Sequence, residues 1–82
     1  MIYTKKEFTK DFAEIVLEAL VTAPRSQLAP KLKQEAIDFK GRIHTLQQSY
    51  DFCNYIYKQP EPDASSFVKV LCNVTKYYIR PE

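Results

Sequence analysis

The segment between residues 29 and 57 carries the pattern that most constrains this fold. Nine apolar residues recur there at alternating steps of three and four: Ala29, Leu32, Ala36, Phe39, Ile43, Leu46, Tyr50, Cys53 and Tyr57. A period of 3.5 residues held for about four heptads is typical of a long helix that packs on partners along its whole length. We therefore predict that this seam faces the core, with Phe39, Ile43 and Leu46 at its middle.

The seam predicts one long central helix, from about residue 30 to residue 58. Pro30 suits its first turn, where the missing N–H would have no partner in any case. Gly41 is the weak point, because glycine inside a helix costs about 1 kcal/mol relative to alanine. The seam runs through Gly41 in phase and places it on the outer face, so we expect a helix that is at most bent there. A break into two helices is the alternative.

A shorter helix is predicted on the N-terminal side, over about residues 5–23. Thr4 to Glu7 has the spacing of a capping box, in which the Thr4 hydroxyl and the Glu7 carboxylate satisfy each other's backbone amides. An apolar stripe at helical spacing follows, made up of Phe8, Phe12, Ile15, Val16, Ala19 and Ala23. Pro24 disfavours helical geometry at the residue before it and therefore ends the helix.

A third helix is predicted over about residues 64–79, after the breaker Gln59-Pro60-Glu61-Pro62. Its stripe would consist of Phe67, Val70, Leu71, Val74, Tyr77 and Tyr78. A strand is the alternative, because the segment is rich in β-branched and aromatic residues. Such a strand would need a pairing partner, and the rest of the chain offers at most Ile2-Tyr3.

Together these segments predict an all-α fold in which a long central helix is packed by two shorter, antiparallel helices. With 82 residues, the chain is expected to form a single domain, residues 1–82. No internal repeat stands out. Neither a long apolar run nor the apolar core of a signal peptide is found, so we expect a cytoplasmic protein without a membrane segment.

Catalytic and metal-binding chemistry is not expected. Cys53 and Cys72 lack further cysteines or histidines at ligand spacing, so a zinc site is short of ligands. We interpret both as buried free thiols, offset along their helices by too much for a disulfide. His44 is the single histidine and one glycine cannot form a phosphate-binding loop. We expect neither an enzyme nor a bound cofactor.

The basic residues of the central segment suggest nucleic-acid binding as an alternative function. The net charge is only +2, and the candidate phosphate contacts are Lys31, Lys33, Lys40 and Arg42. They lie on opposite flanks of the predicted helix and alternate with acidic residues, whereas phosphate binding favours a face of a single sign. Binding to a membrane surface is not expected either, because the outer face of the first helix is acidic.

Apolar side chains in excess of the predicted stripes favour a protein-interaction module. Six of them point away from the stripes or crowd the aromatic end of the central helix: Leu17, Val21, Tyr50, Phe52, Tyr55 and Ile56. Tyrosine is enriched at protein interfaces, so we expect contact with an unidentified protein and self-association, with a dimer favoured. The alternative is a three-helix core that is wrapped more completely and leaves no such surface.

Overall fold

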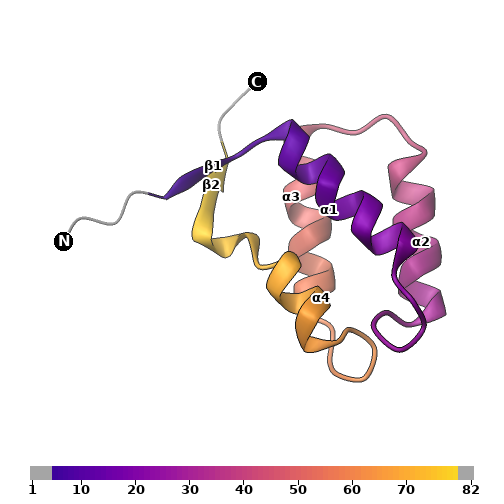
Figure 1. Ribbon diagram of the computed structural model, residues 1–82. Helices are drawn as coiled ribbons and strands as arrows, with labels where there is room; N and C mark the ends of the chain where they lie inside the picture. The colour runs from indigo at the N-terminus through magenta and orange to yellow at the C-terminus, as the bar shows by residue number, and fades with distance from the viewer. Residues whose placement is uncertain (1–4, 80–82) are drawn as a thin grey trace.

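A computed structural model describes residues 5–79 and is mostly helical (Figure 1). Four α-helices are accompanied by one turn of 3-10 helix and by a sheet of two short strands. In chain order the elements are β1 (Lys6–Phe8), α1 (Lys10–Thr22), α2 (Pro30–Lys40), α3 (Leu46–Tyr57), α4 (Ser66–Leu71), the 3-10 helix η1 (Val74–Lys76) and β2 (Tyr77–Ile79). The predominance of helix is confirmed, but the predicted set of three helices is not what the structure shows.

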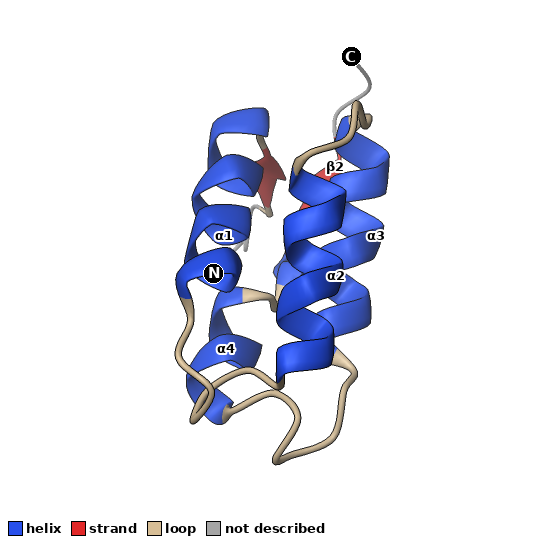
Figure 2. Cartoon of the chain, turned by 90° about the vertical axis from the view of Figure 1, so that its right-hand side faces the viewer, coloured by secondary structure: helices blue, strands red, loops and turns tan. Residues whose placement is uncertain are grey.

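The predicted central helix is broken at Gly41, so α2 and α3 form an antiparallel hairpin (Figure 2). Gly41 has an ordinary negative φ of −77°. The helix therefore does not break because residue 41 needs a left-handed backbone conformation. The decisive residue is Thr45, whose side chain accepts a hydrogen bond from the Gln48 amide while the Gln48 side chain accepts one from the Thr45 amide. This capping box starts a new helix five residues after α2 has ended.

The predicted seam survives in two pieces on either side of this turn. Leu32 and Ala36 of α2 are buried, as are Leu46 and Cys53 of α3. Ile43, expected at the centre of the core, is instead fully exposed in the turn. The prediction for Ile43 is therefore wrong, because the seam residues of two separate helices happened to stay in phase across a turn.

Both ends of the chain also differ from prediction. The first helix begins at Lys10, with Thr9 as the cap accepting from the Phe12 amide at 3.1 Å; the predicted cap at Thr4 lies outside the described residues. Lys6–Phe8 is a strand that pairs in parallel with Tyr77–Ile79. The C-terminal segment therefore contains both predicted alternatives, a helix that ends at Leu71 and then a strand, with a partner that the sequence analysis did not identify.

The core lies between α1, the α2–α3 hairpin and α4. Helix α1 packs on α2 and α3, and α4 packs on α3. The largest fully buried side chains include Phe8, Leu20, Leu28 and Ile56. Strand β1 contributes through Phe8, whose ring meets those of its aromatic neighbours edge-on.

The two halves of the described chain repeat one architecture, although no repeat is visible in the sequence. Equivalent positions lie 36 residues apart: the helix caps Thr9 and Thr45, the prolines Pro24 and Pro60, the bridge residues Leu28 and Ala64, and the buried pairs Leu32 with Val68 and Ala36 with Cys72. Each half is a helix, a tight loop and a second helix. The backbones of the two loops join in an antiparallel bridge, with hydrogen bonds of 2.8 Å from the Ala29 amide to the Asp63 carbonyl and from the Ser65 amide to the Gln27 carbonyl.

Candidate functional site

The predicted interface residues do not form one surface. Leu17 and Ile56 are fully buried in the core, which removes them from any contact with a partner. Val21 is half-buried and packs against the core, and so does Tyr50, whose ring lies edge-on to Phe8 with 5.4 Å between the ring centroids. These four residues therefore fit the predicted alternative, in which the helices cover the core more completely.

Tyr55 is 40% exposed, and Phe52 is half-buried, with one part of its side chain against the core. The α2–α3 hairpin gives both of them aromatic neighbours. Phe39 stacks on Phe52 with 4.6 Å between centroids and 6° between planes. The turn that follows α2 brings the His44 ring to within 4.4 Å of the Phe39 centroid. We call the surface formed by these groups the hairpin patch; it consists of Phe39, Ile43, His44, Phe52 and Tyr55.

Two shallow grooves, of about 360 and 260 Å³, flank the Phe39–Phe52 stack. Both are lined by Arg42 as well as by the two rings. Three carboxylates complete their rims, Asp51 in one groove and Glu35 with Asp38 in the other. The hairpin patch is therefore an apolar centre with a rim that carries three negative charges and one positive charge.

The rim carboxylates are held by neutral hydrogen-bond donors. The Tyr55 hydroxyl donates to Glu35 at 2.9 Å, and this bond, with burial and the nearby negative charge, raises the pKa of Tyr55. Asp38 and Asp51 each accept a hydrogen bond from the glutamine four residues earlier on the same helix. These neutral partners orient the carboxylates but leave their negative charge available to a cationic partner.

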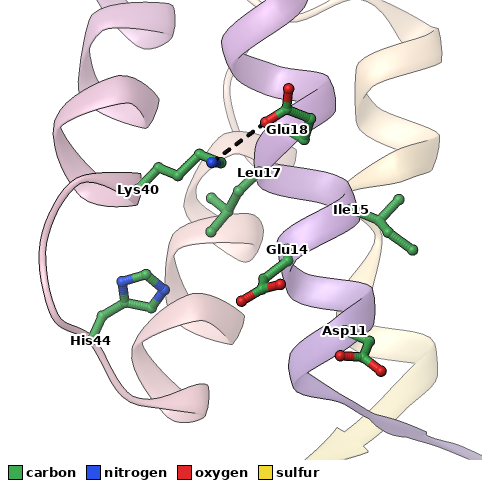
Figure 3. A pocket seen from close by; sticks show the side chains of 7 residues that line it. All are labelled: Asp11, Glu14, Ile15, Leu17, Glu18, Lys40 and His44. Carbon is green, nitrogen blue, oxygen red and sulfur yellow. Dashed lines mark ion pairs between the residues drawn. The ribbon is translucent and has the colours of Figure 1, made fainter.

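A third groove, of about 630 Å³, lies between α1 and the end of α2 (Figure 3). Three acidic residues of α1 line it: Asp11, Glu14 and Glu18. The Lys40 ammonium crosses the groove to the Glu18 carboxylate at 3.4 Å, and Ile15 points to the opposite side of α1 from Lys40 and His44. The ion pair ties α1 to α2 and occupies one of the candidate phosphate contacts.

The remaining candidate phosphate contacts are spread over the surface. Lys31 and Arg42 are exposed, whereas Lys33 is half-buried. Arg42 lines the two grooves beside the hairpin patch, where its charged neighbours are the carboxylates of the rim rather than other cations. The described residues therefore do not bring these four side chains together into one basic face.

A second apolar surface, on α4, was missed because its residues were assigned to the core. The predicted stripe placed Phe67 and Val70 inside, but the buried residues here are Val68 of α4 and Cys72, which follows its last residue. Phe67 and Val70 are 59% and 66% exposed, and Lys69 lies between them in the sequence. We call Phe67, Lys69 and Val70 the α4 patch; a helix of six residues offers too little periodicity for the sequence to fix its buried face.

The two cysteines are free and fully buried, as predicted, but they are not offset from each other. The thiol of Cys53 is a hydrogen-bond partner of Cys72, and this contact, together with burial, raises the pKa of the Cys72 thiol. A buried thiol held in its protonated form is a poor nucleophile. The pair therefore acts as part of the core.

Within residues 5–79, no group of three or more His, Cys, Asp or Glu side chains is arranged to hold a metal ion. None of the helices described is both long and apolar enough to cross a membrane. Comparison of the chain with protein-family models, with curated proteins and with solved structures gives no match. Function must therefore be argued from the surfaces themselves.

Proposed function

We propose that this protein is a non-catalytic protein-interaction module that also associates with itself, and that the hairpin patch is its contact surface. The observation that carries the proposal is Ile43, a large apolar side chain that is fully exposed in a turn. The groove that Ile43 lines also contains the stacked rings of Phe39 and Phe52 and the His44 ring, with polar side chains from Arg42, Gln48 and Asp51 at its rim. Contiguous apolar surface of this kind, rimmed by polar residues, is typical of protein-binding sites on soluble proteins.

The composition of the hairpin patch supports the same proposal. Phenylalanine, tyrosine and arginine are enriched at protein interfaces, and aromatic anchors carry much of the binding energy there. Phe39 and Phe52 hold each other by stacking, so little side-chain entropy remains to be lost when a partner binds. The Tyr55–Glu35 hydrogen bond fixes a third aromatic side chain in the same way.

Nucleic-acid binding, the alternative function, has less support. Lys40 is paired with Glu18, and Arg42 has three carboxylates around it. A phosphate backbone approaching the hairpin patch would meet three carboxylates and one guanidinium at its rim. This repulsion disfavours phosphate contact beside the rings of the hairpin patch, which would otherwise be available to stack on bases.

The proposal can be tested by photo-crosslinking in the native cells. A photoreactive phenylalanine analogue is placed at Ile43, and at Ile15 as the matched control, because Ile15 is also an exposed isoleucine but lies on α1. We expect the probe at Ile43 to capture a protein, either another copy of this chain or a different one, and Tyr55→Glu to abolish the capture. If the probe at Ile43 captures no more than the probe at Ile15, the hairpin patch is not an interaction surface and the proposal is wrong.

A further inference from the structure

We infer that the occupant of the hairpin patch is the α4 patch of a second copy of this chain, so that the protein associates head to tail. This inference rests on the proposed function, since it names the partner of the same surface. It is supported by the chemistry of the two patches. Each one exposes large apolar side chains, and their charges are opposite.

The charge of the hairpin patch is set by its rim. Glu35, Asp38 and Asp51 line the two grooves together with Arg42, which leaves an excess of negative charge around the apolar centre. The hydrogen bonds described above reach them from tyrosine and glutamine side chains, which carry no charge to offset theirs. A partner that brings cations beside an apolar side chain therefore fits this surface.

The C-terminal part of the described chain has that combination. Residues 66–79 contain Lys69 and Lys76 and no acidic residue. Phe67 and Val70 flank Lys69 in the sequence and are both more than half exposed. Val70 and Lys69 line one groove on this helix, so packing the α4 patch against the Phe39–Phe52 stack would combine burial of Phe67 and Val70 with attraction between Lys69 and the carboxylate rim.

The two patches do not meet within one chain, since neither Phe67 nor Val70 lines the grooves beside the Phe39–Phe52 stack. The hairpin patch lies where α2 meets α3, whereas α4 packs on α3. In Figures 1 and 2, α2 lies alongside α3, and α4 is a separate helix after the loop that follows α3. Two different patches on one chain make a heterologous contact, which propagates as rings or open chains instead of closing as a two-fold dimer.

Two variants separate the patches without disturbing the core. Ile43→Arg replaces a fully exposed side chain and places a cation against the incoming lysines. Phe67→Glu replaces a side chain that is 59% exposed, and a carboxylate in the first turn of α4 is favourable to the helix. Ile15→Arg is the matched control, because it also introduces a charge in place of an exposed isoleucine, but outside both patches.

The experiment is sedimentation of the purified full chain at up to ~100 μM, a range that detects micromolar association. We expect assemblies of the wild type and of Ile15→Arg, and monomers of Ile43→Arg and of Phe67→Glu, all with the same helical circular dichroism. An equimolar mixture of the two monomeric variants should form a complex of two chains and nothing larger. In that mixture Phe67→Glu supplies the intact hairpin patch and Ile43→Arg supplies the intact α4 patch.

Other outcomes overturn the inference. A mixture that stays monomeric, or a Phe67→Glu variant that associates like the wild type, shows that the α4 patch is not the occupant. A wild type that is monomeric at the highest concentration shows the same. In each of these cases, capture of a different protein from position 43 would leave the interaction surface of the proposed function standing, and a monomeric wild type would remove only its self-association. The two proposals can therefore fail separately.

Discussion

Leu32 and Ile43 belong to the same sequence seam but differ completely in burial, so we compare the effect on stability of replacing each by alanine. Leu32 is fully buried in α2, whereas Ile43 is fully exposed in the turn. Leucine-to-alanine changes at buried sites cost about 3–5 kcal/mol, through lost apolar burial and the cavity left behind. For a chain of 82 residues, the whole free energy of unfolding is about 4–12 kcal/mol. Leu32→Ala should therefore remove between about a quarter and all of the stability.

Ile43→Ala should cost under about 0.5 kcal/mol, because no burial is lost. The measurement is urea denaturation followed by far-ultraviolet circular dichroism, with the denaturant slope compared between variants to verify that both unfold in the same way. Leu32→Ala serves as the internal standard for a buried position. A cost above about 1 kcal/mol for Ile43→Ala would refute the broken helix and restore a continuous seam that faces the core.

Two further predictions concern the cap and the thiols. Thr45→Ala removes the hydroxyl that starts α3 and should lower the free energy of unfolding by about 1 kcal/mol, measured by the same denaturation; an unchanged value would mean that the turn holds α3 without its cap. The raised pKa of the Cys72 thiol means that the unfolded chain ionises first as the pH rises. Stability should therefore be full below pH ~8.5 and should fall above it, by up to about 1.4 kcal/mol per pH unit for one thiol. Cys72→Ala should reduce this decrease of stability with pH. A thiol reagent should label Cys53 and Cys72 only on unfolding, and rapid labelling of the folded protein would contradict their burial.

The helical class and much of the core could be predicted from the sequence, because both follow from local periodicity. Leu32, Ala36 and Cys53 were placed correctly by the seam alone. The turn could not be placed in this way, since a stripe that stays in phase across it looks continuous. The missed signal was Thr45 followed by Gln48, a capping box inside the seam.

The candidate site was harder to predict than the core because it depends on contacts between elements. Phe52 and Tyr55 were selected for excess apolar character, but Leu17 and Ile56 were selected on the same grounds and are buried. Sequence spacing identifies a side chain that is off the main stripe. It does not tell whether another helix covers that side chain. The partner of β2 was missed for a related reason, since its residues lie near the opposite end of the chain.

The repeated architecture was also invisible, because the halves share a burial pattern but few residue identities beyond the cap threonines and the loop prolines. Leu32 corresponds to Val68 and Ala36 to Cys72, pairs that preserve apolar character but not identity. The equivalent loops agree in the proline that opens them and in the bridge that joins them. Such equivalence becomes evident only when the backbone is seen.

The parallel pairing of β1 with β2 determines how the fold would respond to a pulling force. The chain enters the ladder at Lys6, beside Tyr77, and leaves it at Ile79, beside Phe8, so the two exits lie at opposite ends of the ladder. Tension applied through the flanking chain would slide the strands along each other and load all of their hydrogen bonds at once. An antiparallel pair with both exits at one end would instead open one bond at a time. The small sheet would thus be loaded in shear, and its hydrogen bonds would have to break before the tension reached the helices.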